Sequence, residues 1–320
     1  MKEDAGFIFM TNFQDHDTAR FDQTDLQLKL KLKKQTLIIP SSKTFTLKKD
    51  QSVILPFNLS MEGALLKYST TQLLAKVEEK NAVHYFFFAP EGLRTEYSFD
   101  KSTLSSGKEF YTPKPGLKST FSITVKNGKT LKITTLTRQQ ALNTTKVNNH
   151  ILITEATVLP EKEQCTLLSL GKTQISYALY TANKGWKEET IEVQPVDVKA
   201  DWKKVGTRRM TVKIDQPDVP QVNDYFLRVN YVADVAMAFI GGYLVLDHYY
   251  YGIPWTIGLR RFKNELKNEY LSFYFRPLRK DAPFIGDLPV EAIPDFSQKD
   301  ADCLVRSVDV IPEYKAIVNI

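Results

Sequence analysis

Apolar and polar residues alternate along much of this chain, a pattern typical of β-strands that bury one face. Residues 26–32 are the clearest case, because leucine fills every second position and glutamine or lysine the positions between. This segment predicts one half-buried antiparallel strand. Similar short runs continue to residue 193, with turn residues about every eight to twelve positions. The spacing predicts an all-β fold, built as a sandwich or barrel.

Two local signals within this pattern are more specific. Residues 119–134 alternate on both sides of Asn127-Gly128, which predicts a hairpin with a type I′ turn. Thr137 is followed three positions later by Gln140, the spacing of a capping box. It predicts one short helix from Arg138 to about residue 145.

Residues 226–262 hold a second pattern, rich in β-branched and aromatic residues. Gly241-Gly242 interrupts it and predicts a hairpin whose turn needs positive φ. An aromatic block, Tyr249-Tyr250-Tyr251, follows the second strand, and Gly252, Pro254 and Trp255 come after it.

The domain prediction divides the chain after a strand that ends near Pro195. Residues 1–195 are predicted to form an antiparallel β-sandwich region, divided again near residue 115, and residues 196–320 a jelly-roll. Residues 303–320 predict one or two strands for which the sequence gives no partner.

Composition narrows the class of protein. The 320 residues are 42% hydrophobic and 25% charged, as in soluble globular proteins. No apolar run reaches the roughly 18 residues that a membrane span needs. The net charge of +6 comes with no nucleic-acid-binding motif, and lysines on strand faces discourage edge pairing. We therefore expect no nucleic-acid partner and no membrane span.

The N-terminal segment MKEDAGFIFMTNF has acids directly after Lys2 and no small-residue cleavage site, so it does not predict a secretory signal. Two compartments stay open. A complete chain would be cytoplasmic, whereas a piece of a longer enzyme with an upstream signal would be periplasmic or extracellular.

Metal and cofactor signals are weak. Asp15-His16-Asp17 is predicted to be a polar turn, because adjacent side chains diverge, although it has metal-ligating residue types. Cys165 and Cys303 lie far apart and lack a C-x-x-C neighbour, so we expect free thiols, with a disulfide left open. No cofactor and no metal are predicted.

Two segments carry a resemblance to a known family. Residues 238–262, AFIGGYLVLDHYYYGIPWTIGLRRF, resemble the C-terminal jelly-roll module of bacterial β-galactosidases of glycoside hydrolase family 35. Residues 55–100 are similar to the β-rich region that follows the catalytic barrel in those enzymes. The resemblance covers most of residues 6–287. It implies the non-catalytic C-terminal region of such an enzyme, with a galactose-binding-like jelly-roll at 196–320.

The resemblance also implies where catalysis is absent. Family members use two glutamates about 5 Å apart, mounted on a (β/α)₈ barrel. This chain lacks the alternation of strands and helices that a barrel needs. Two fragments, residues 77–81 and Asn268-Glu269-Tyr270, resemble the acid/base motif. We expect their glutamates to be solvated, and we predict no hydrolase activity and no catalytic residue in this chain alone.

The best binding candidate is the aromatic corner, where sugar rings would stack on tyrosine and tryptophan and polar groups would bond hydroxyls. Its candidate carbohydrate-binding residues are Asp247, His248, Tyr249, Tyr250, Tyr251, Trp255 and Arg260. The alternative is that these aromatic rings pack inside the jelly-roll.

The resemblance therefore implies an accessory region of a β-galactosidase-like glycoside hydrolase. Its predicted partners are a catalytic (β/α)₈ barrel and a galactoside or other glycan. Two alternatives stay open: a free-standing carbohydrate-binding module, and a structural or protein-interaction domain with an exposed apolar patch.

Overall fold

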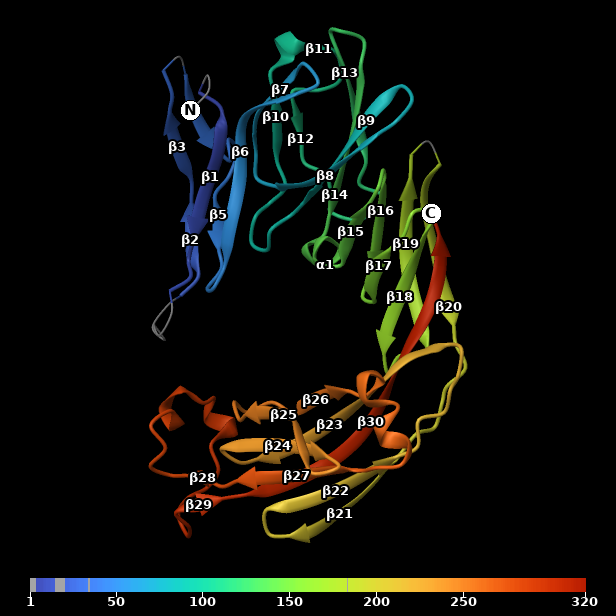
Figure 1. Ribbon diagram of the computed structural model, residues 1–320. Coiled ribbons are helices and arrows are strands. Elements are labelled where there is room, and N and C mark those ends of the chain that lie inside the picture. The colour runs from blue at the N-terminus through green and yellow to red at the C-terminus, as the bar shows by residue number, and fades with distance from the viewer. Residues whose placement is uncertain (1–3, 15–20, 34, 183) are drawn as a thin grey trace. The chain divides into compact units, whose positions relative to one another are not determined.

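The computed structural model describes residues 4–14, 21–33, 35–182 and 184–320, and their regular secondary structure is almost entirely β-strand (Figure 1). The predicted all-β class is confirmed. Asp15-His16-Asp17 lies outside the described residues. Two compact units divide the chain: unit 1 is Met1–Glu155, Ser176–Glu189 and Ile320, and unit 2 is Ala156–Ile175 and Thr190–Asn319. The domain boundary near residue 195 stays a prediction.

Unit 1 begins with a five-stranded antiparallel sheet and two small two-stranded sheets. In spatial order, the sheet consists of β1 (Gly6–Thr11), β6 (Ser52–Met61), β7 (Ala64–Ser69), β10 (Tyr97–Phe99) and β12 (Phe110–Tyr111). The two-stranded sheets pair β2 (Gln23–Leu26) with β5 (Phe45–Leu47) and β3 (Leu28–Lys31) with β4 (Thr36–Ile39).

The prediction of one half-buried antiparallel strand over residues 26–32 is confirmed for Leu28–Lys31 and is wrong at Leu26, which belongs to another strand. The alternating segment is split between β2 and β3, which pair with different partners. The break lies at Gln27, whose side-chain amide donates to the carbonyl of Pro40 at 3.0 Å. Asp25 has a φ of 55°, so the backbone leaves the extended conformation just before the break.

A second five-stranded sheet completes the larger part of unit 1. In spatial order it contains β11 (Leu104–Ser106), β13 (Phe121–Val125), β14 (Thr130–Leu136), β9 (Ala82–Phe88) and β8 (Gln72–Glu78). Strands β9 and β14 pair in parallel, which the sequence did not predict. A short 3₁₀ turn, η1 (Lys101–Thr103), precedes β11.

The hairpin of β13 and β14 is confirmed, but its turn is not of type I′. That type needs positive φ at both central residues. Here Gly128 has a φ of +86° and Asn127 is not among the residues with positive φ. The amide of Gly128 instead donates to the carbonyl of Val125 at 2.9 Å, so glycine follows the tight turn rather than lying at its centre.

The predicted helix is present and shorter than expected. Helix α1 spans Arg138–Leu142, and the capping box of Thr137 and Gln140 is complete. The helix ends at Asn143 because Thr144 begins a strand of the third sheet. In spatial order that sheet contains β15 (Thr144–Val147), β16 (His150–Thr154), β19 (Gln174–Thr181) and β20 (Gly185–Glu192).

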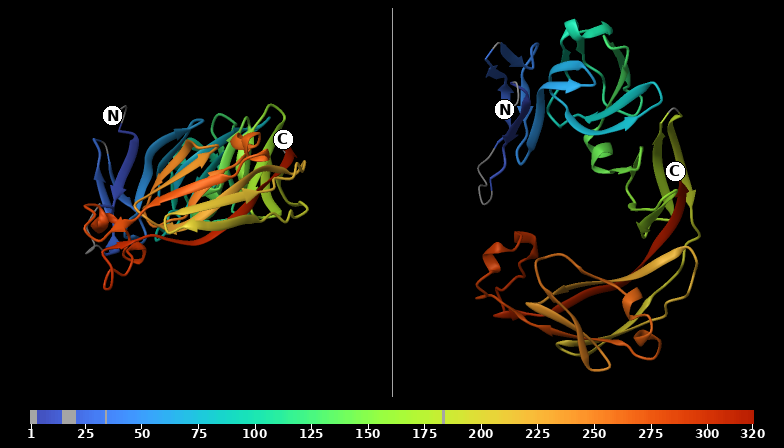
Figure 2. Two further views of the ribbon diagram at one scale, coloured as in Figure 1. Left: turned by 60° about the horizontal axis from the view of Figure 1, so that its bottom comes forward. Right: turned by 45° about the horizontal axis from the view of Figure 1, so that its top comes forward.

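Unit 2 is a sandwich of two five-stranded antiparallel sheets (Figure 2). One sheet is ordered β17 (Thr157–Pro160), β18 (Gln164–Leu170), β30 (Leu304–Asn319), β23 (Val222–Val232) and β26 (Trp255–Gly258). The other is ordered β21 (Ala200–Gly206), β22 (Arg209–Ile214), β27 (Leu271–Arg276), β24 (Val235–Ile240) and β25 (Tyr243–Tyr249). Fully buried side chains from both sheets, such as Leu227 and Phe273, share one core.

The predicted hairpin turn at Gly241-Gly242 is confirmed, since both glycines have positive φ, +56° and +85°. The strand predicted within residues 303–320 is β30, and the structure supplies the partners that the sequence did not indicate. It is 16 residues long, pairs with β23 along one part and with β18 along the other, and lies in the middle of its sheet (red in Figures 1 and 2).

The remaining elements of unit 2 are short. They are the strands β28 (Leu278–Arg279) and β29 (Ala301–Asp302), which pair with each other, and the 3₁₀ turns η2 (Arg260–Phe262), η3 (Glu265–Lys267), η4 (Ile285–Asp287) and η5 (Val290–Ala292). The assignment of residues 196–320 as a galactose-binding-like jelly-roll is more specific than this architecture and stays a prediction.

Candidate functional site

The aromatic corner lies where β25 leaves one sheet of unit 2 and β26 enters the other. His248 on β25 stacks on Trp255 of β26, with ring centroids 5.3 Å apart and an interplanar angle of 9°. The Trp255 side chain is 6% exposed, and Phe273 meets it edge to face at 5.8 Å. The indole therefore helps to close the sandwich core, and histidine covers a ring face that the sequence assigned to sugar.

A buried tyrosine that the sequence did not single out fixes His248. The Tyr231 hydroxyl lies 2.7 Å from Nδ1 of His248 and 3.2 Å from its carbonyl oxygen. Burial lowers the pKa of His248, although the nearby Asp247 carboxylate opposes this shift. Burial also raises the pKa of Tyr231 well above its ordinary value. Both groups are consequently neutral at pH 7.

Tyr250 and Gly252 fasten the corner to the turn η5. Tyr250 is buried and donates its hydroxyl to the carbonyl of Ala292 at 2.8 Å. Gly252 has a φ of +93°, and a Cβ placed on it would meet the Cβ of Ala292 at 2.5 Å. Glycine is required here both for the backbone conformation and for the close approach.

The other candidate residues of the corner are separated. Tyr249 and Tyr251 are exposed, as is Asp247. Arg260 belongs to a different cluster, because its guanidinium donates to Oδ1 of Asn223 and its backbone amide to Oδ1 of Asp224, both at 2.7 Å. It lines a hollow of about 190 Å³ near the 216–225 loop. Carbohydrate binding by these seven residues stays a prediction, carried by the exposed members.

The two glutamates of the 77–81 fragment differ sharply in their surroundings. Glu78 is solvated as expected, since its side chain is 59% exposed and pairs with Lys76 at 2.8 Å. The expectation is wrong for Glu79, whose side chain is 3% exposed. Glu269 of the other fragment is exposed.

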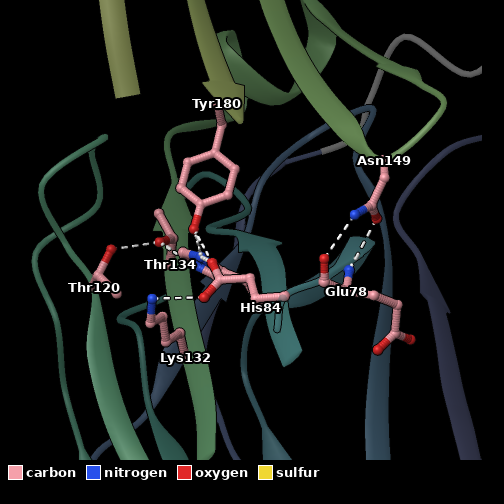
Figure 3. A network of polar contacts seen from close by, with 8 residues as sticks. Glu78, His84, Thr120, Lys132, Thr134, Asn149 and Tyr180 are labelled. Carbon is pink, nitrogen blue, oxygen red and sulfur yellow. Dashed lines mark hydrogen bonds and ion pairs between the residues drawn. The ribbon is translucent and has the colours of Figure 1, made fainter. Parts of the chain in front are cut away.

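Glu79 is the centre of a buried polar network that joins three strands of unit 1. Figure 3 labels the members Lys132, Tyr180 and His84. Lys132 on β14 donates to its Oε2 at 2.7 Å, and the Tyr180 hydroxyl on β19 donates to its Oε1. His84 on β9 extends the network, because its Nδ1 lies 2.6 Å from the Tyr180 hydroxyl.

The direction of these hydrogen bonds follows from their geometry. Tyr180 gives its proton to Glu79, so Nδ1 of His84 must donate to the tyrosine oxygen. The neutral imidazole then accepts at Nε2 from the Thr134 hydroxyl, 2.7 Å away. Thr120 in turn lies 2.6 Å from Thr134 and donates to it. Every side chain of the network has a defined role as donor or acceptor.

The charges of the network are equally defined. Burial lowers the pKa of His84 to about 4, although Glu79 opposes this, so the imidazole is neutral at pH 7. Burial alone would raise the pKa of Glu79, but the hydrogen bonds from Lys132 and Tyr180 outweigh it and hold that pKa below its ordinary value. The carboxylate is ionised and opposed by one ammonium group.

This arrangement suits a structural role better than acid–base catalysis. A retaining glycosidase needs a second carboxyl group about 5 Å away, whereas Glu79 is surrounded by lysine, tyrosine and histidine. Asn149 adds to this network, because its side-chain amide accepts from the backbone amide of Glu78 at 2.9 Å and donates to the Glu78 carbonyl at 2.6 Å. The network ties the β8–β9 turn to the third sheet.

A second buried carboxylate was also missed by the sequence analysis. Glu96 accepts from the backbone amide and hydroxyl of Ser41, at 2.8 and 3.0 Å, and from the Ser42 hydroxyl at 2.8 Å. The Tyr68 hydroxyl donates to it at 2.5 Å. Four donors to one buried carboxylate fix the turn after Pro40.

Within the described ranges, no three His, Cys, Asp or Glu side chains come together to hold a metal ion. Cys165 and Cys303 are free thiols, and burial raises the pKa of each. No helix in the described part of the chain has the length and apolar character to cross a bilayer.

The fold defines the class of protein: an all-β chain whose sheets form two compact units. Residues 1–158 match the family model of β-galactosidase, domain 2. The match supports a non-catalytic β-galactosidase domain in the first half of the chain. A comparison with curated proteins gave no match.

Proposed function

We propose that this chain is the non-catalytic region of a family 35 β-galactosidase-like hydrolase and that it supports a separate catalytic barrel. One observation carries the proposal. The match to β-galactosidase domain 2 covers residues 1–158, and the long N-terminal segment of unit 1 ends at Glu155. An accessory domain of that kind acts beside a catalytic domain. The chain on its own is then inactive on β-galactosides.

The outer face of strands β1 and β6 is the surface best suited to the barrel. Phe9 and Phe7 point away from the core and are 74% and 44% exposed. Phe9 is paired in register with Ile54, which is also exposed. A strip of large apolar side chains on an edge strand is typical of a face that a partner covers.

The test is assembly with a separately produced family 35 barrel. We expect the chain alone to leave an aryl β-galactoside intact and to raise the activity or stability of the barrel when mixed with it. Replacing both Phe7 and Phe9 by serine should weaken assembly about twentyfold to three-hundredfold. A fully buried phenylalanine contributes about 1.5 to 3 kcal/mol, and exposures of 44% and 74% leave this pair about 1.8 to 3.5 kcal/mol to gain on assembly.

Tyr243→Ser is the matched control, because Tyr243 is 80% exposed but lies in unit 2. If the chain hydrolyses the galactoside by itself, or if the serine variants assemble as well as the parent, the proposal fails at the corresponding step.

The second candidate function is a free-standing carbohydrate-binding module. The exposed rings of Tyr249 and Tyr251 favour this function, as does the exposed Asp247 carboxylate on the same strand as Tyr249. Sugar faces stack on such rings. In this function, glycan binding would be lost in a Tyr249→Ala/Tyr251→Ala variant that remains folded.

A further inference from the structure

A hollow of about 430 Å³ lies in unit 1. Its walls come from the β5–β6 turn, the start of β8, the end of β9 and helix α1. The volume is within the range of small-molecule sites, about 300 to 1,000 Å³. We call it the Arg138 pocket, after the cation that the first residue of α1 contributes to its rim.

One wall of the Arg138 pocket is apolar. Leu74 and the half-buried ring of Phe88 line it, and Leu142 projects from the end of α1 with most of its surface exposed. Leu74 and Phe88 also pack against the core that joins the second and third sheets. The wall is thus held by the fold, while its outer surface stays open to a ligand.

The facing wall provides hydrogen-bond donors. The side-chain oxygen of Gln72 accepts from the backbone amide of Ile54 at 2.6 Å, which fixes the amide group and leaves its NH₂ to donate elsewhere. Arg138 is exposed at the rim and adds a planar set of donors. Lys49 contributes an ammonium group from the β5–β6 turn.

The charges of the lining argue against an anionic ligand. The Lys48 ammonium is already paired with Asp22 at 2.8 Å. Lys49 and Arg138 are then balanced by the carboxylates of Asp50 and Glu91. A phosphate or sulfate group would meet nearly equal attraction and repulsion, whereas a neutral ligand rich in hydroxyls fits both the donors and the acceptors.

From this combination we infer that the Arg138 pocket binds one or two units of a neutral saccharide. The apolar C–H face of a sugar ring lies against Phe88 and Leu142, and Arg138 and Gln72 donate to its hydroxyls. This inference rests on the proposed function, because a galactoside-processing enzyme presents neutral oligosaccharides to its accessory domains. It places a binding site in unit 1, where the sequence pattern gave no sign of one.

The experiment measures binding by titration calorimetry, in which the full chain is titrated with lactose and with a β-1,4-linked galactotetraose. Arg138→Ala should weaken binding about tenfold, as expected for loss of one charged hydrogen-bond donor. Leu142→Ser should weaken it by a smaller factor. Arg94→Ala is the matched control, because Arg94 is an exposed arginine of unit 1 that is not part of the pocket lining.

Each outcome decides between the sites. Absence of binding to the parent chain overturns the inference while leaving assembly with the barrel untouched. Binding that is lost in Tyr249→Ala/Tyr251→Ala but kept in Arg138→Ala also overturns it, and assigns the site to the aromatic corner. Unchanged thermal unfolding of each variant shows that a loss of binding does not come from a loss of folding.

Discussion

Replacing Lys132 by methionine tests whether the Glu79 network holds unit 1 together. The substitution keeps most of the aliphatic side chain but removes the ammonium group that donates to Glu79 at 2.7 Å. Glu79 then remains a buried carboxylate, held by the Tyr180 hydroxyl and near a neutral His84. The variant therefore changes the charge of the network without opening a large cavity.

The size of the loss in unfolding free energy depends on how deeply the Lys132 and Glu79 side chains are buried. Breaking a fully buried ion pair by removing one partner costs about 3 to 5 kcal/mol. The Lys132 side chain is 36% exposed, so solvent already screens part of this interaction. We therefore expect the free energy of unfolding of unit 1 to fall by about 2 to 3 kcal/mol.

Amide hydrogen exchange is the suitable assay, because it reports on unit 1 separately from unit 2. Protection of β8, β9 and β14 should decrease together in Lys132→Met. Lys129→Met is the control: Lys129 pairs with Glu62 at 2.8 Å, but its side chain is 56% exposed. Exposed ion pairs of this kind contribute at most about 1 kcal/mol.

The double variant Glu79→Gln/Lys132→Met should recover part of the loss, because it removes the uncompensated charge. If Lys132→Met is no less stable than Lys129→Met, or if the double variant is as unstable as the single one, the charge balance of the network does not stabilise unit 1.

Two other predictions concern a titration and a turn. The pKa of His84 is about 4 in the folded chain and about 6.5 in the unfolded chain, so between these values only the unfolded chain takes up the proton and stability should fall as pH drops. In His84→Gln, the unfolding free energy measured with urea should depend less on pH between about pH 4 and 6.5. An unchanged pH dependence would contradict the assignment. Gly252→Ala should lower the unfolding free energy of unit 2 by about 1 to 3 kcal/mol, because its Cβ meets Ala292 and its φ is positive; Gly286→Ala, which has open space around it, is the control in the same thermal scan, and equal melting temperatures would refute the steric argument.

The sequence predicted those features that depend on neighbouring residues. The capping box of α1, the glycine turn between β24 and β25, and the hairpin of β13 and β14 all rest on contacts within a few residues. Binary patterning failed where the strand changes its partner within a regular run, as at Gln27, because the alternation continues through that change. The parallel pairing of β9 and β14 depends on the path of the chain, which alternation does not record.

The candidate site was predicted less well, for a physical reason. Residue type shows that tyrosine, tryptophan and histidine can meet a sugar, but it does not show which ring faces are covered. Trp255 and Tyr250 proved to be buried, and the seven residues divide between two clusters. The Glu79 network was missed because its members come from segments up to 101 residues apart. Neither a motif nor a period joins such residues.

Strand β30 has a consequence for how unit 2 assembles during synthesis. Its two neighbours in the sheet, β18 and β23, are both translated earlier and meet each other only through it. Until β30 has been translated and has paired, both carry an unpaired edge, the kind of surface on which strands of other chains can pair. A nascent chain halted before residue 304 would thus hold a split sheet, and quality control would act on unit 2 at that stage of its production.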